Sequence, residues 1–282
     1  IAWRLTANPR HMWLHGQDGL VRQMDLAVDD LDAVRSVLAD IHAGAGMPIG
    51  QSVKSGSQTR GALFARMEPQ VAAFRAAVED ALAEYRAGLP PHDPTHPLLA
   101  RRDDPWSITG SWSILLDGEG HHAPHIHPRG VISSASYLIV PDEVDDAERS
   151  GWLELGRPPT EMSIDLEPLR AVKPREAGCV LFPSTLFHGT RPIRSGRRMT
   201  VAFDMTPLAV SAQPYLDRLS EQLHEACNLA TLEGEQVLYI ARSAIPQRLI
   251  SVDLSVGSRL PAYCTSMGRI LLAALDDDQL QD

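Results

Sequence analysis

Cysteine is scarce in this chain of 282 residues: Cys179, Cys227 and Cys264 are far apart, and each lies in an apolar stretch. This odd, widely spaced set supplies neither the C-x-x-C pairs of a zinc motif nor the even number of a disulfide framework. We therefore predict three small core residues in a reducing compartment and a cytoplasmic protein.

Long apolar runs are also absent, because no stretch approaches the roughly 20 residues that a membrane-spanning helix needs. The opening residues, Ile1-Ala2-Trp3-Arg4, lack the basic start and apolar block of a signal peptide. The chain has no initiator methionine and stops abruptly after Asp276-Asp277-Asp278. We expect it to be a fragment of a longer protein.

Positive charge is in deficit, with 26 lysines and arginines against 36 acidic residues and a formal net charge of −10. Such a balance argues against a protein whose main role is to bind nucleic-acid phosphates or anionic membranes. The hydrophobic share of 44% and the charged share of 22% are ordinary for a globular protein. The length predicts one or two domains.

Residues 1–105 predict mainly helices and loops. Apolar residues recur every three or four positions from Asp29 to His42 and from Pro69 to Gly88, which predicts two helices. The polar, glycine-bearing segment Gln51 to Thr59 between them predicts a surface loop, with an active-site flap as the alternative.

From Trp106 the pattern changes to short apolar or alternating runs separated by glycine, proline and aspartate. These runs are Ser111–Leu116, Ile132–Val140, Cys179–Phe182 and Met199–Phe203. Strands of this length and spacing predict an all-β sandwich or barrel. Because the helices come first, we expect them to support one side of a β core formed by residues 106–207.

A third pattern follows Thr206-Pro207, so we place a domain boundary at about 207–213 and predict two domains, 1–207 and 208–282. The second begins with an amphipathic helix and contains a hairpin joined at Glu233-Gly234-Glu235. Its predicted elements are the helix through Leu216, Leu219, Leu223 and Cys227, strands Asn228–Leu232, Gln236–Ala241 and Leu249–Val256, and a final helix near Ser266–Leu275.

The densest chemical signal is a histidine-rich stretch from His121 to Pro128. His125 and His127 are two residues apart, so on a strand both imidazoles face the same side. Imidazole suits iron, zinc, copper and nickel, and a third ligand must come from elsewhere. His188 is the best candidate, because an apolar strand ends in a turn just before it. We predict that His121 and His122 are loop residues.

Two arginines, Arg197 and Arg198, open the strand-like run that leads to Phe203. An arginine at the buried end of a metal cavity can bind a carboxylate through two parallel hydrogen bonds. We favour Arg198 because it abuts the strand, and Arg197 is the alternative. A metal at one end and a guanidinium at the other suit 2-oxoglutarate, which chelates iron and presents a far carboxylate.

Residues 1–207 resemble the 2-oxoglutarate- and iron(II)-dependent oxygenase domains of the prolyl-hydroxylase-like branch. The matching stretches are Gln51-Ser52 through Gln58-Thr59, His125-x-His127-Pro128 leading to Ser134–Leu138, Gly151–Gly156, Phe182-Pro183-Ser184 with His188-Gly189, and Arg198–Asp204. The resemblance implies an α+β chain with a double-stranded β-helix (jelly roll) and supporting N-terminal helices.

That resemblance also implies a dioxygenase that uses O2, converts 2-oxoglutarate to succinate and hydroxylates a C–H bond of a small-molecule or peptidyl substrate. The iron(II) ligands it implies are His125, His127 and His188. It further implies that Arg198 or Arg197, together with Tyr137, binds the 2-oxoglutarate.

The ligand set departs from the usual non-haem iron triad of two histidines and one carboxylate. His127 stands where most of the superfamily has an acid, and the spacing of Asp117 and Glu119 favours neither as a substitute. A cupin is the minor alternative, but a cupin has a glutamate shortly after the histidine pair, and Gly130 to Ser134 contains no acid.

Residues 213–282 resemble the first part of the effector-binding domain of IclR-type transcriptional regulators, particularly those that sense aromatic acids. The matching stretches are Leu219–Glu225, Asn228–Ala230, Gly234–Ala241, Ser255–Tyr263 and Thr265–Leu272. The resemblance implies a truncated α/β segment. No helix-turn-helix reader is evident, so we do not expect direct DNA binding.

A second interpretation of the whole chain is therefore a ligand-sensing regulator fragment joined to an oxygenase-like module. The junction at Pro207-Leu208-Ala209 is either a natural fusion or an artefact of gene assembly, and both alternatives stay open. The sequence predicts no oligomeric state.

Overall fold

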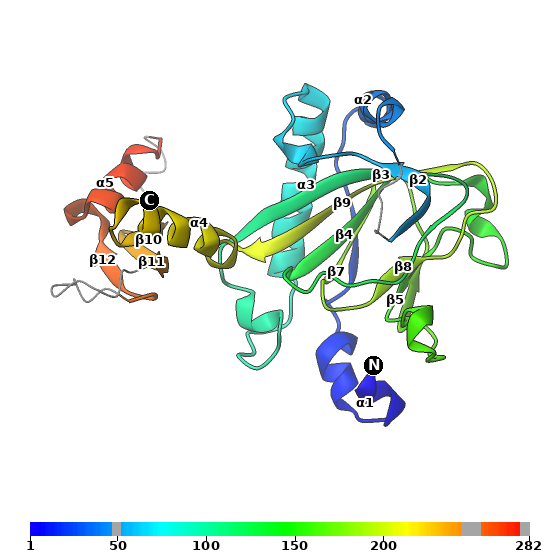
Figure 1. Cartoon of the computed structure of the whole chain (residues 1–282), viewed down its shortest axis with the longest axis horizontal. Helices are drawn as coiled ribbons and strands as arrows, with labels where there is room; N and C mark the ends of the chain where they lie inside the picture. Colours follow the sequence, from blue (N-terminus) through cyan, green and yellow to red (C-terminus); the bar gives the residue numbers. More distant parts are fainter. Residues whose placement is uncertain (47–51, 244–254, 277–282) are drawn as a thin grey trace. The chain divides into compact units, whose positions relative to one another are not determined.

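The computed structural model describes residues 1–46, 52–243 and 255–276 (Figure 1). The chain divides into two compact units, one of residues 1–104 and 108–206 and the other of residues 105–107 and 207–282. Within the described ranges, no helix has both the length and the apolar character needed to span a bilayer.

A six-stranded sheet forms the centre of the first unit, in the order β1-β7-β4-β9-β3-β2. Its strands are β1 (Arg22–Asp25), β2 (Val53–Gln58), β3 (Trp106–His122), β4 (Ile132–Ile139), β7 (Gly178–Pro183) and β9 (Arg197–Pro207). Strand β4 pairs antiparallel with β7 on one side and with β9 on the other. All four strands predicted between residues 111 and 203 are confirmed, with β3 and β9 longer than their apolar runs.

A smaller sheet of order β6-β5-β8 lies against the large one. Its strands are β5 (Leu153–Leu155), β6 (Arg170–Val172) and β8 (His188–Thr190). One buried cluster joins the two sheets: Tyr137 of β4, Val180 and Phe182 of β7, and Leu153 and Leu155 of β5. Two facing sheets with a shared apolar core form the double-stranded β-helix that the family resemblance implies.

Helices cover the opposite face of the large sheet (Figure 1). A short helix, α1 (Ala2–Leu5), precedes α2 (Leu31–Ala43) and α3 (Pro69–Ala87). Helix α2 contacts β4, and α3 contacts β1 and β7. The side chain of Asp30 accepts a hydrogen bond from the Ala33 amide (2.8 Å) and so caps α2, while Pro69 occupies the first turn of α3. Both predicted helices are confirmed.

The predicted surface loop from Gln51 to Thr59 is wrong for most of its length. Residues 53–58 form strand β2, which pairs antiparallel with β3 and places Val53 opposite His122. His121 and His122 therefore lie in β3 and not in a loop. Strand β2 lies at the edge of the sheet and is held by backbone hydrogen bonds to β3. Such pairing does not require apolar side chains, so the polar, glycine-bearing composition gave no sign of a strand. Gln51 lies outside the described residues.

The second unit contains helix α4, a three-stranded sheet of order β10-β11-β12 and helix α5. The elements are α4 (Leu208–Leu223), β10 (Cys227–Glu233), β11 (Gln236–Ser243), β12 (Arg259–Pro261) and α5 (Ser266–Ala273). The predicted hairpin is confirmed as β10 and β11, whereas Cys227 begins β10 instead of continuing the helix. Of the predicted strand Leu249–Val256, residues 249–254 lie outside the described ranges, and 255–256 form no strand.

The three cysteines differ in exposure, so their prediction as core residues holds only for Cys179. Cys179 is buried, Cys227 is partly buried and Cys264 is exposed. Burial raises the pKa of the Cys179 thiol to about 12.

Candidate metal centre

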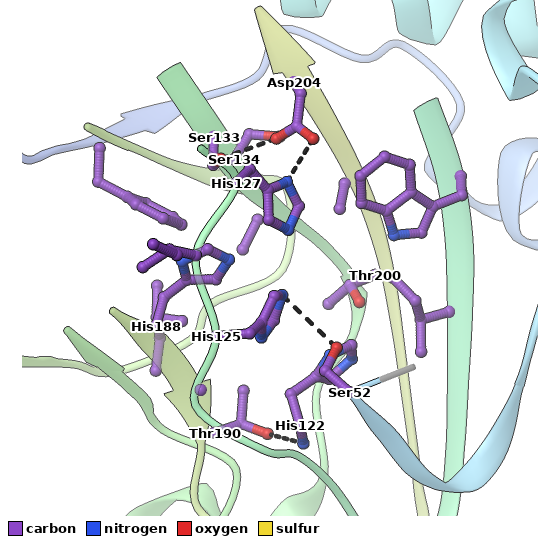
Figure 2. A pocket seen from close by; sticks show the side chains of 18 of the residues that line it. Ser52, His122, His125, His127, Ser133, Ser134, His188, Thr190, Thr200 and Asp204 are labelled. Atoms are coloured by element: carbon purple, nitrogen blue, oxygen red, sulfur yellow. Dashed lines mark hydrogen bonds and ion pairs between the residues drawn. The ribbon is translucent and has the colours of Figure 1, made fainter. Parts of the chain in front are cut away.

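Three histidines converge at the wall of a cavity between the two sheets (Figure 2). His125, His127 and His188 each offer a ring nitrogen, and these nitrogens all lie within 4.8 Å of one another. The ring centroids are 5.0 Å apart for His125 and His127, 4.2 Å for His125 and His188, and 5.1 Å for His127 and His188. The structure thus brings together all three predicted metal ligands.

Backbone pairing holds the histidines in place. The amide of His125 donates to the carbonyl of His188 (3.0 Å), and the His188 amide donates back to His125 (2.9 Å). The amide of His127 donates to the Ser184 carbonyl (3.0 Å). The pair therefore lies on an extended segment with a single β-bridge, not on the strand that the spacing predicted. A β-carbon at Gly189 would come within 2.9 Å of the His122 carbonyl oxygen, so glycine allows this close approach.

Each of the three rings has one nitrogen engaged away from the cluster. Nδ1 of His125 lies 2.8 Å from the Ala123 carbonyl oxygen, and Nδ1 of His188 lies 3.0 Å from that of Leu186. Nδ1 of His127 contacts a carboxylate oxygen of Asp204. Each of these acceptors takes a proton from Nδ1, so in the neutral form of each ring the lone pair lies on Nε2. Burial lowers the pKa of His125 and lowers that of His188 well below its usual value, so both rings are neutral near pH 7.

The cavity has a volume of about 430 Å³ and includes a buried cation. Arg198 lies on β9, lines the cavity and is 2% exposed. Its guanidinium carbon lies 5.1 Å from the ring centroid of Tyr137. Its Nε finds no hydrogen-bond partner among the described residues, and burial lowers the pKa of the guanidinium. A buried guanidinium with an unused donor favours a carboxylate ligand.

The two other predicted cofactor contacts differ from Arg198. Arg197 is exposed at the start of β9 and is not part of the cavity wall. Tyr137 is 1% exposed and packs in the apolar cluster between the sheets, so it is not among the residues that line the cavity either. Burial raises the pKa of this phenol, which therefore stays a hydrogen-bond donor.

The cavity residues that the sequence prediction did not assign to the site include three polar ones near the histidines: Ser52, His122 and Asp204. The hydroxyl of Ser52 lies 3.4 Å from Nδ1 of His122 and 3.5 Å from Nε2 of His125. Asp204 could have been found from alternation, because residues 198, 200, 202 and 204 of β9 all line the cavity. His122 and Ser52 depend on the β2–β3 pairing, for which the sequence gives no local signal.

Two family models match different parts of the chain. Residues 110–204 match the family described as "Putative 2OG-Fe(II) oxygenase", and residues 200–282 match the C-terminal part of the bacterial transcriptional regulator IclR. The chain thus joins an oxygenase-like segment to an IclR-like segment, and both predicted resemblances are confirmed.

Individual relatives follow the same division. The Pca regulon regulatory protein of Pseudomonas putida is 78% identical over 77 residues, which are 27% of this chain and 26% of that protein. The chain spans about a quarter of the length of the curated relatives it matches.

Among solved structures, a Pseudomonas putida prolyl-4-hydroxylase is 16% identical with a TM-score of 0.45, covering 72% of this chain and 98% of that one. HygX from Streptomyces hygroscopicus, solved with nickel, 2-oxoglutarate and hygromycin B, is 14% identical with a TM-score of 0.46. The match covers 70% of this chain and 85% of the HygX chain.

Proposed function

We propose that the first unit is an iron(II)- and 2-oxoglutarate-dependent dioxygenase that hydroxylates a C–H bond of a small-molecule or peptidyl substrate. The observation that carries the proposal is one cavity that presents three converging imidazoles and a buried guanidinium whose Nε has no hydrogen-bond partner among the described residues. His125, His127 and His188 hold the iron, and Arg198 binds the far carboxylate of 2-oxoglutarate.

The residues present fit both groups. Each Nδ1 is engaged, so the three Nε2 atoms are the ones available to a divalent ion, and three protein ligands leave coordination positions open for a chelating oxoacid and O2. The Nε of Arg198, on the cavity wall, is a buried donor that a carboxylate would satisfy. The fit favours Arg198 over Arg197 as the cofactor residue.

When bound, iron(II) and 2-oxoglutarate supply the oxidation of a C–H bond with O2. The protein's own residues orient these two groups and exclude water from the cavity. Trp112, Ile114 and Phe182 line the cavity with apolar surface, which lowers the local dielectric and strengthens the pairing of Arg198 with a carboxylate. Arg198 and the three imidazoles, which line the same cavity, would set the direction in which the oxoacid lies.

Succinate release from 2-oxoglutarate in the presence of iron(II) tests the proposal. We expect the wild type to release succinate, and His188→Ala and Arg198→Ala to lose most of this activity. His92→Ala is the matched control, because His92 is exposed and is not part of the cavity wall. Undiminished turnover by His188→Ala, or no iron binding by the wild type, would contradict the assignment.

A second function, ligand sensing by an IclR-type regulator fragment, is supported by the high identity of residues in the second unit to a regulatory protein. We infer that this unit alone does not bind DNA. Electrophoretic mobility-shift measurements with the full chain should show no sequence-specific complex, and specific operator binding would reverse the order of the two proposals. Sequencing across residues 207–209 in source DNA distinguishes a natural fusion from an assembly artefact.

A further inference from the structure

The three histidines differ in what lies behind them. The Nδ1 atoms of His125 and His188 face neutral backbone carbonyls, at 2.8 and 3.0 Å. The Nδ1 of His127 instead contacts the carboxylate of Asp204, as the dashed line in Figure 2 shows. Among the described ligand histidines, His127 is therefore the one that is backed by a formal negative charge.

Asp204 is itself held in a defined orientation. Its Oδ1 accepts a hydrogen bond from the Ser133 hydroxyl (2.7 Å), and that hydroxyl lies 2.9 Å from the hydroxyl of Ser184. Asp204 and Ser133 are directly opposite in the β4–β9 ladder, so two paired strands fix this contact. The side chains of His127 and Asp204 are about one-fifth exposed, at 20% and 17%. Partial burial and a second hydrogen bond keep the carboxylate directed at the ring.

The position of the Asp204 carboxylate compensates for the absence of an acid among the three metal ligands. The usual triad brings one negative charge to the metal through a directly bound acid. Here that position is a histidine, and the acid stands one ring further away. A carboxylate that accepts the far N–H of a metal-bound imidazole fixes its tautomer and makes Nε2 a stronger donor. The charge thus reaches the metal through the imidazole.

We propose that Asp204 is a positioning residue that holds His127 with Nε2 toward the metal and supplies the negative charge that the all-histidine ligand set lacks. The proposal rests on the metal site of the proposed function, but not on 2-oxoglutarate turnover. It differs from direct ligation by an acid, because Asp204 engages Nδ1 and is not one of the clustered ligand atoms.

Anaerobic titration calorimetry with iron(II), without 2-oxoglutarate, tests the charge. We expect Asp204→Asn and Asp204→Ala to bind iron about 10- to 100-fold more weakly than the wild type, the range for residues behind a ligand. Asp117→Asn is the matched control, because Asp117 is an exposed acid on β3, and it should bind as the wild type does. Ser133→Ala removes the hydrogen bond to Asp204, together with the one to Ser184, and leaves the carboxylate in place, so it should give a smaller loss and provides a milder variant if Asp204→Ala fails to fold.

A second measurement follows the protonation of the His127 ring. In long-range proton–nitrogen spectra of the zinc-loaded protein, Nδ1 of His127 should carry a proton in the wild type and in Asp204→Asn, whereas Asp204→Ala should shift this signal. Unchanged iron affinity in both Asp204 variants, with His188→Ala impaired, would overturn the role of Asp204 while leaving the metal site intact. Weak binding by Asp117→Asn would assign the missing charge to that acid instead. Iron binding without succinate release would contradict the oxygenase proposal and leave the role of Asp204 standing.

Discussion

The two units of this chain differ in the extent of side-chain burial and in sequence identity to known proteins, and the two differences run in opposite directions. In the first unit, residues that are almost fully buried occur in every long strand and in both long helices, and they enclose a cavity with a charged residue inside. In the second, helix α4 buries only Leu216 and Ser220, while Tyr215, Leu219 and Leu223 on the same helix are exposed. The second unit has the higher sequence identity to a curated protein. The buried cluster of the second unit is small and consists of Val237, Tyr239 and Ala262.

The largest expected effect tests the contrast in burial with one substitution type in both units. Leu181 of β7 is 0% exposed and lies on the sheet face opposite the cavity, because its neighbours Val180 and Phe182 join the cluster between the sheets. We expect Leu181→Ala to lower the free energy of unfolding of the first unit by about 2–5 kcal/mol, the usual cost of a buried leucine. Chemical denaturation followed by tryptophan fluorescence measures this change.

Leu219→Ala on α4 is the counterpart in the second unit. Its side chain is 44% exposed, so we expect a change within about 0.5 kcal/mol. Equal losses from the two substitutions would break the comparison, since they would show that α4 is covered as fully as β7.

The next effect sharpens the contrast between two adjacent arginines, of which Arg198 lines the cavity and Arg197 is exposed. We expect Arg198→Ala to weaken 2-oxoglutarate binding to the iron-loaded protein by about 10- to 100-fold, since a hydrogen bond to a charged group contributes ~1.5–3 kcal/mol. Arg198→Lys should recover part of the loss, because lysine keeps the charge but not the two parallel donors. Arg197→Ala should change affinity less than about twofold, as an exposed charge contributes little.

Calorimetric titration under anaerobic conditions measures these affinities. A larger loss in Arg197→Ala than in Arg198→Ala would assign the carboxylate to the alternative arginine and leave the buried guanidinium without a role.

Most of the fold and the centre of the site could be predicted because their signals are local. Helical periodicity located α2 and α3, and short alternating runs located the strands that position His188 and Arg198. The spacing of His125 and His127 predicted one shared face, although the segment is not a regular strand. What failed depends on pairing between distant residues. The polar edge strand β2 and the in-strand position of His122 follow from the register that places Val53 opposite His122. No local pattern encodes that register.

The last effect concerns acid, and it separates the units because His224 is the one histidine of eleven that lies in the second. His42 of α2 has its ring nitrogens 2.8 Å from the Ser57 hydroxyl and 3.0 Å from the Ser113 hydroxyl. Burial, helped by the charge of Arg197, lowers its pKa to about 4. Below about pH 6.5 the unfolded chain takes up a proton that the native ring excludes.

The free energy of unfolding of the first unit should therefore decline as the pH falls from about 6.5 to about 4. His42 contributes to this slope through the uptake of up to one proton on unfolding. In metal-free protein, His42→Gln should show a shallower decline than the wild type when denaturation is repeated across this range. His92→Gln, which changes an exposed histidine, should keep the wild-type slope. If the slope of His42→Gln equals that of the wild type, the native ring takes up its proton as readily as the unfolded one. The acid sensitivity of the first unit would then come from other histidines, those of the metal centre among them.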